Sequence, residues 1–60
     1  MIRVEYRRGP SVITEEATRM ATLKLALEEA RGRALDLGAD VILVIDSEGN
    51  KYGPFDVGGF

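Results

Sequence analysis

Polar and hydrophobic residues alternate strictly at the start of the chain. Ile2, Val4 and Tyr6 occupy one side of an extended segment, and arginine and glutamate side chains occupy the other. This is the period of a half-buried strand, so the pattern predicts a strand over residues 2–7. The breaker segment 8–11 follows, because its proline has a fixed φ and disfavours the helical region for the residue before it.

A helical pattern follows the breaker segment. Thr14 is a suitable N-cap, and the two glutamates after it suit the positive end of a helix dipole. From Glu15 to Leu37 only Gly32 weakens the helical pattern, and Gly38 stands at the usual left-handed C-terminal position. The sequence therefore predicts one long helix over residues 15–37, about 35 Å in length.

The second half of the chain predicts a hairpin. Residues 41–45 form an unbroken, mostly β-branched apolar run, which is typical of a central strand covered on both faces. A turn cluster occupies residues 46–50, where Gly49 can take a positive φ. Residues 51–57 can return as a third strand, and Pro54 restricts that strand to an edge of the sheet.

This order of elements predicts an α+β fold in a single domain over residues 1–60. The expected topology is β-α-β-β, with a three-stranded mixed sheet and one long helix packed on one face. The helix would return over the sheet, so we expect the first two strands to be parallel and joined by a right-handed crossover.

The apolar residues of the predicted helix form two seams, separated by about 140° at 100° per residue. The first seam consists of Met20, Leu23, Leu27, Ala30, Ala34 and Leu37. The second consists of Ala17, Ala21, Leu25, Gly32 and Leu35. One seam is enough to cover one small sheet, so the second seam is left without a partner. The predicted helix is also longer than strands of about 20 Å. The far side of the central strand would be uncovered. We therefore predict a homodimer or larger ring, with Ala21, Leu25, Gly32 and Leu35 as the candidate interface.

Composition removes several classes of chemistry. The chain contains no cysteine, histidine or tryptophan, so it lacks disulfides, thiolate metal ligands and the commonest general base. Eight basic residues against ten acidic ones give a net charge of −2, without the basic field of a phosphate-backbone binder. We predict no catalytic residue, no metal and no cofactor.

Arg7, Arg8 and Ser11 are the candidate anion-binding residues. They precede the predicted helix N-terminus, where free N–H groups and the dipole favour an anion. Two glutamates at the same helix end and the acidic net charge oppose this, so a solvated loop is the preferred interpretation. Binding of a nucleic acid or another anion, with help from Arg3, is the alternative function.

The turn residues have the alternate spacing of calcium-loop ligands, at Asp46, Glu48 and Asn50. However, Lys51 stands where that loop needs glycine, and Val57 stands where it needs a bidentate glutamate. A hairpin turn accounts for these residues without a metal.

Two further groups of residues have a structural explanation. Charged residues four apart predict ordinary pairs on a solvated helix surface, namely Glu15 with Arg19, Lys24 with Glu28, and Glu29 with Arg33. Aromatic residues near the C-terminus are expected to cover the open end of the core, namely Tyr52, Phe55 and Phe60.

The stretch 26–53 resembles a widespread family of short bacterial proteins known only as a domain of unknown function. The resemblance is carried by the junction Leu37-Gly38-Ala39-Asp40-Val41 and the turn Asp46-Ser47-Glu48-Gly49. It implies a helix followed by a hydrophobic strand and a hairpin, and no catalytic residue. The aromatic hairpin that precedes the helix in that family has no counterpart in this prediction.

The predicted element order is similar to that of dodecins, small flavin-binding shells that build ligand sites only on oligomerisation. Their flavin-stacking tryptophan has no counterpart in this sequence, so this similarity concerns topology alone. A 60-residue monomer has little volume in which to form a pocket, so any ligand pocket would have to lie between subunits.

The leading functional prediction is a non-enzymatic, homo-oligomeric interaction module. A nucleic-acid or anion-binding accessory protein is the first alternative, and a small-ligand carrier with an intersubunit pocket is the second. The longest unbroken apolar run in the chain covers residues 41–45. It is far shorter than the about 18 residues that a membrane-spanning helix needs. We therefore expect a cytoplasmic protein with no membrane contact.

Overall fold

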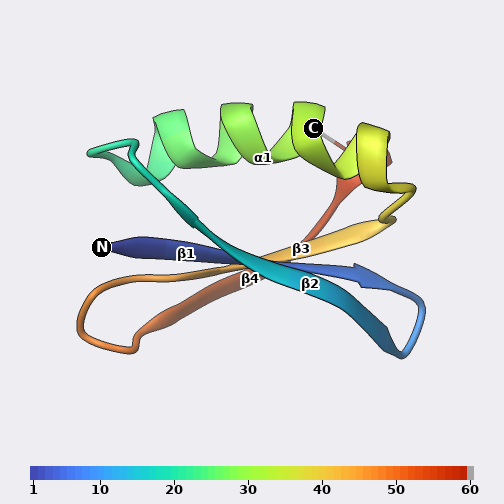
Figure 1. Cartoon of the computed structure of the whole chain (residues 1–60), viewed down its shortest axis with the longest axis horizontal. Helices are drawn as coiled ribbons and strands as arrows, with labels where there is room; N and C mark the ends of the chain where they lie inside the picture. The colour runs from blue at the N-terminus through green and yellow to red at the C-terminus, as the bar shows by residue number, and fades with distance from the viewer. Residues whose placement is uncertain (60) are drawn as a thin grey trace.

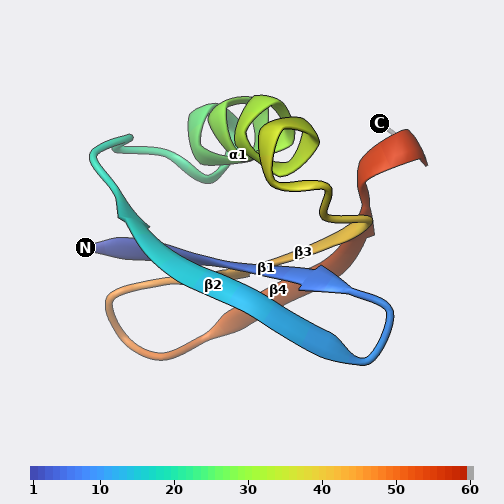
Figure 2. The same ribbon diagram turned by 45° about the vertical axis from the view of Figure 1, so that its right-hand side comes forward.

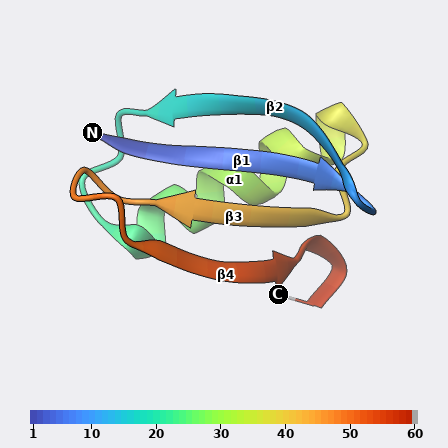
Figure 3. The ribbon, with the colours of Figure 1, turned by 90° about the horizontal axis from the view of Figure 1, so that it is seen from below.

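Two antiparallel hairpins lie on either side of one helix along the chain. The computed structural model, which describes residues 1–59, contains β1 (Ile2–Arg8), β2 (Ser11–Thr18), α1 (Leu23–Leu37), β3 (Val41–Ile45), β4 (Lys51–Asp56) and the 3-10 turn η1 (Val57–Gly59). The strands form one sheet in the order β2-β1-β3-β4 (Figure 3). The helix lies across one face of this sheet (Figure 1). An α+β fold is therefore confirmed, whereas the three-stranded β-α-β-β arrangement is wrong.

The missing strand is β2, which occupies residues assigned to the start of the helix. Gly9 adopts a φ of 56°, so that Gly9 and Pro10 turn the chain directly back along β1. The β-branched residues Val12, Ile13 and Thr14 then continue in the extended conformation, which suits them better than a helix. Thr14 is thus a strand residue and not a helix N-cap.

The helix begins eight residues later than expected. Thr22 has an extended backbone, and its Oγ1 accepts a hydrogen bond from the N–H of Leu25 at 3.3 Å, as an N-cap residue does. The helix has 15 residues, or about 22 Å at 1.5 Å per residue, and the longest dimension of the molecule is 26 Å. The helix does not outreach the sheet, so its length does not support self-association.

The C-terminal end of α1 agrees with the sequence. Gly38 has a φ of 72°, and its N–H points to the carbonyl oxygens of Ala34 and Leu35. This left-handed cap, which glycine adopts without steric cost, sets the direction in which the chain enters β3.

All neighbouring strands are antiparallel, so the expected mixed sheet is wrong. β1 runs antiparallel to both β2 and β3. The helix therefore connects β2 and β3, which run in the same direction with β1 between them. The central position of Val41–Ile45 and the edge position of Lys51–Asp56 are confirmed.

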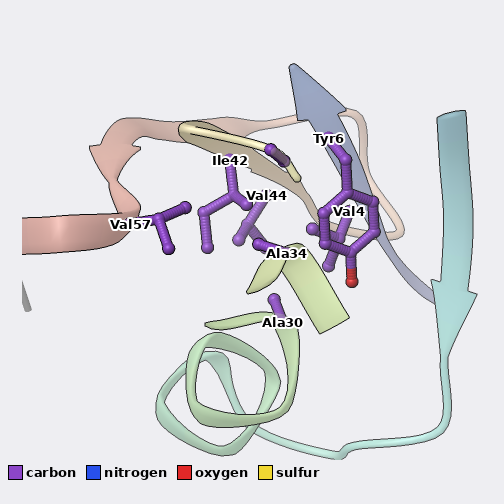
Figure 4. Close-up of a cluster of buried hydrophobic side chains, with 8 residues drawn as sticks. Val4, Tyr6, Ala30, Ala34, Ile42, Val44 and Val57 are labelled. Carbon is purple, nitrogen blue, oxygen red and sulfur yellow. The ribbon is translucent and has the colours of Figure 1, made fainter. Parts of the chain in front are cut away.

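The core lies between the helix and the two central strands (Figure 4). It consists of Val4, Tyr6, Ala30, Ala34, Ala39, Ile42, Val44 and Val57. Its largest side chains come from alternate residues of β1 and β3. Val4 pairs with Val44 and Tyr6 pairs with Ile42, so these four side chains share the face of the sheet that the helix covers. The alternation expected at the start of the chain is thus confirmed.

The other face of the sheet is not covered by any element among residues 1–59 (Figure 2). Val41, Leu43 and Ile45 of β3 lie on this face, and each is half-buried. They stand directly opposite three charged residues of β1, namely Arg7, Glu5 and Arg3. Long charged side chains cover apolar neighbours with their stems, so this face is less apolar than the sequence predicts.

Candidate interaction surface

The inner face of α1 is made of alanine. Ala26, Ala30 and Ala34 are its three buried residues, each at most 1% exposed. They step by four along the chain and therefore form one ridge on the helix. Because these side chains are small, the helix can lie close to β1 and β3.

Large apolar side chains lie on the opposite side of the helix. Leu25 is 46% exposed and Leu35 is 67% exposed. At 100° per residue, these two leucines share with Glu28 and Gly32 the side that points away from the alanine ridge. We call these four residues the outer face. The helix thus buries its smallest apolar side chains and exposes two of its largest.

Gly32 lies at the middle of the outer face, at a position where the fold leaves room for a side chain. A Cβ added there would meet no atom within 4 Å, and its φ is not in the left-handed region. Glycine in a helix interior costs roughly 0.5–1 kcal/mol relative to alanine. The fold of a single chain therefore gives no reason for glycine, while its lack of a side chain leaves the outer face flat.

Two polar contacts between α1 and β2 fix the rotation of the helix. Arg33 donates from Nε and a terminal nitrogen to the two carboxylate oxygens of Glu16, at 3.0 Å each. Thr18 donates from its hydroxyl to Glu29 at 2.7 Å. The hydrogen bond from Arg33 lowers the pKa of Glu16. These contacts keep the outer face pointing away from the sheet.

The expected pairs along the helix surface are therefore partly wrong. Glu29 and Arg33 contact β2 in place of each other. Glu15 lies on β2 and pairs with Arg3 at 2.9 Å, and Arg19 precedes the helix. These errors follow from the missed strand, since a helix over residues 15–37 leaves no second element to receive these charges.

Charges of opposite sign flank the outer face. Lys24 and Arg31, seven residues apart, lie along one side of it. Glu29 and Asp36, also seven residues apart, lie along the other side, which faces β2 because Glu29 contacts that strand. The outer face, with its two leucines, Gly32 and Glu28, thus lies between a basic flank and an acidic flank.

The structure brings together three of the four residues of the candidate interface. Leu25, Gly32 and Leu35 lie on the outer face. Ala21 is exposed in the bend before α1 and is not a helix residue. The sequence identified these positions from their helical spacing, but it missed Ala26 as a buried residue of α1 and attached no meaning to the flanking charges.

The candidate anion-binding residues lie in the first hairpin, far along the chain from the helix start. Arg8 and Ser11 pair with each other across the turn. Arg7 donates from Nε to Glu5 at 2.6 Å. Because α1 begins at Leu23, the helix dipole that motivated this site is absent from the hairpin.

An acidic group also lies against this hairpin. The N–H of Gly9 lies within hydrogen-bond distance of both carboxylate oxygens of Asp40, at 3.1 and 3.2 Å. A carboxylate at this position opposes an anion. Anion binding at Arg7, Arg8 and Ser11 stays a prediction, now without its original physical reason.

The second hairpin is closed by Asp46. Its carboxylate accepts hydrogen bonds from the N–H groups of Glu48 and Asn50, at 2.9 Å each, and from the hydroxyl of Tyr52 at 3.0 Å. Gly49 adopts a φ of 87°. These contacts are those of a hairpin turn, and residues 1–59 contain no cluster of acidic or other ligating side chains that could hold a metal ion.

The C-terminal aromatic residues differ in their exposure to solvent. Phe55 is partly buried and packs against the core, whereas Tyr52 is exposed and bonded to the turn. The prediction for Phe60 lies outside the described residues. Phe55 alone thus behaves as a cover for the core.

An open hollow at one end of the sheet lies where the N-terminus meets the β3–β4 turn. It is lined by Met1, Arg3, Glu15, Ala17, Ile45, Asp46, Ser47 and Gly49. Arg3 and Glu15 are already paired with each other there.

Of the helices described in residues 1–59, none is long and apolar enough to cross a membrane.

Comparison of the chain with protein-family models, curated proteins and solved structures gave no match. The resemblance to the bacterial family of unknown function therefore stays a prediction. One part of it changes, because a hairpin that carries Tyr6 does precede the helix. The topological similarity to dodecins rested on a β-α-β-β order that this chain does not have.

Proposed function

We propose that this protein is a non-enzymatic interaction module that binds a second copy of itself through the outer face. The observation that carries the proposal is the exposure of Leu25 and Leu35 on a helix whose buried residues are alanines. A helix that only had to cover one sheet would be more stable with its leucines inside.

The edges of the sheet support this choice of surface. β2 has an irregular register opposite Tyr6 and Arg7 and carries two adjacent glutamates. β4 has an irregular register opposite Ile42 and Val44, and Pro54 cannot donate to a neighbouring strand. Bulges, charges and proline are the features that protect edge strands from pairing with another chain.

A charged residue on the outer face tests the proposal. Leu35→Lys should return the protein to a monomer, because an unpaired charge inside an interface is costly. Val12→Lys is the matched control, since Val12 is also exposed but lies on β2. Mass by light scattering at matched concentrations should fall for Leu35→Lys alone.

Two results would refute self-association through the outer face outright, and a third would place the interface elsewhere. One is wild-type protein that stays monomeric at high micromolar concentration. The other is an oligomer whose mass is unchanged by lysine at both Leu25 and Leu35. Loss of the oligomer in Val12→Lys but not in Leu35→Lys would move the interface to the first hairpin.

A further inference from the structure

We infer that the second copy docks with its helix parallel to α1, about a two-fold axis that runs along the two helices. The resulting dimer has four layers in the order sheet, helix, helix, sheet. The inference rests on the proposed function and adds the orientation of the partner and the residues that select it.

The leucines alone do not choose an orientation. In a parallel pair, Leu25 meets Leu25 of the second copy and Leu35 meets Leu35. In an antiparallel pair centred on Ala30, Leu25 meets Leu35 of the second copy at both ends. Either arrangement covers the two exposed leucines, so the choice falls to the charges beside them.

The flanking charges favour the parallel pair. A two-fold axis along the helices brings each flank against the opposite flank of the other copy. Lys24 then lies near Glu29 of the second copy, and Arg31 lies near Asp36, each five positions further along. This is the spacing of the charge pairs that set orientation in parallel coiled coils.

The antiparallel pair places like charges together. Its two-fold axis is perpendicular to the helices, so the basic flank meets the basic flank and the acidic flank meets the acidic flank. Four attractive contacts in the parallel pair thus become four repulsive ones. Complementary charges select orientation in this way even where they add little affinity.

Glu28 and Gly32 limit the strength of the parallel pair. Glu28 lies close to Glu28 of the second copy across the axis, and the two like charges repel each other. Lys24, one turn earlier, supplies an opposite charge. Gly32 has no side chain and lets the two backbones approach at the centre. The contact is one helix of about 22 Å, so we expect weak, concentration-dependent pairing.

Disulfide trapping tests the orientation directly, because the chain has no cysteine of its own. In the parallel pair, Leu35→Cys places two sulfurs beside the two-fold axis and should form a covalent dimer on mild oxidation. In the antiparallel pair these two positions are about 15 Å apart along the axis, too far for a disulfide. Val12→Cys measures linking by random collision.

A mixture of Leu25→Cys and Leu35→Cys proteins supplies the opposite test. A parallel pair should give only the two symmetric products, Leu25 position with Leu25 position and Leu35 position with Leu35 position. A dominant mixed product would show antiparallel helices and overturn the inference, while leaving the proposed function intact.

Reversal of one charge gives a second readout with opposite signs for the two orientations. Lys24→Glu should weaken a parallel pair by roughly 3- to 10-fold in dissociation constant, because it puts like charges together. The same change should strengthen an antiparallel pair, where Glu at position 24 would meet Arg31. The monomer should tolerate it, since an acidic residue suits the first turn of a helix.

Two control variants accompany this measurement. Lys24→Arg keeps the charge and should leave the dissociation constant unchanged. Lys51→Glu makes the same change in net charge on β4 and should also leave it unchanged. A stronger dimer in Lys24→Glu, or a dimer in which Leu35→Cys links no faster than Val12→Cys, overturns the inference alone. Wild-type protein that is monomeric throughout overturns the proposed function as well.

Discussion

Single side chains determine which way α1 faces. The alanines at positions 26, 30 and 34 fill the space above the central strands, so no leucine of the helix is fully buried. The largest fully buried side chains come from the sheet, namely Ile42, Val4 and Val44. At the residue scale, stability therefore depends on β1 and β3, while the helix supplies the exposed apolar surface.

Ile42→Ala should lower the free energy of unfolding by about 2–5 kcal/mol, because it leaves a cavity at a fully buried site. Leu27→Ala should cost less, since Leu27 is only partly buried. Urea denaturation of dilute protein measures both. An Ile42→Ala variant with an unchanged midpoint would contradict the placement of the core.

Asp46→Asn should make stability less dependent on acid pH. Burial acts to raise the pKa of Asp46, but hydrogen bonds from Asn50, Tyr52 and Glu48 outweigh it, and the pKa lies below its ordinary value of 3.8. The stabilisation by ionised Asp46 is therefore fully present above that value, and it is lost as pH falls through the lowered pKa.

The variant should accordingly melt below the wild type at neutral pH, with a difference that shrinks as the pH falls below about 4. Asparagine can still accept from the backbone N–H groups of Glu48 and Asn50, so the turn should persist. Thermal melts over this pH range measure the difference. A difference that is the same at every pH would contradict the assignment.

Individual turn and cap residues could be predicted from the sequence, because their signals are local. Gly38 and Gly49 take the positive φ values expected of them. The outward positions of Leu25 and Leu35 also follow from helical spacing. The partners of Glu16, Glu29 and Arg33 could not be found, since they depend on which element faces the helix.

At the scale of elements, β2 shows where the sequence is ambiguous. Residues 15–18 suit a helix start as well as a strand, and only pairing with β1 decides between them. That pairing depends on the two-residue turn at Gly9 and Pro10, which the sequence marks as a breaker but not as a hairpin. Once β2 is a strand, the shorter helix and the antiparallel sheet follow.

Gly32→Ala should stabilise the monomer by roughly 0.5–1 kcal/mol, because alanine fits the helix and meets no neighbour. In the parallel dimer the added methyl group would lie at the centre of the contact and weaken association. Denaturation of dilute protein measures the first effect, and sedimentation measures the second.

Gly38→Ala is the matched control for this change. Its φ of 72° is unfavourable for alanine, so it should destabilise the monomer where Gly32→Ala stabilises it. If Gly32→Ala also destabilised dilute protein, the glycine would have a role within one chain. Its presence would then no longer support the outer face as an interface.

At the scale of the whole molecule, two layers leave two surfaces without a cover. On the open face of the sheet, Val41, Leu43 and Ile45 are each half-buried and stand beside charged residues of β1. The outer face of α1 keeps two exposed leucines and a glycine, with charges of opposite sign on its two sides. This asymmetry is the reason why we propose the helix, and not the open face of the sheet, as the surface that a second copy covers.

Sedimentation equilibrium of the wild-type protein, from low to high micromolar concentration, measures whether the chain associates with itself. We expect a mass that rises with concentration from 6.6 kDa towards twice that value, and a melting temperature that rises in parallel because association stabilises the folded state. A mass that stays at 6.6 kDa over the whole range, with a melting temperature independent of concentration, would contradict self-association.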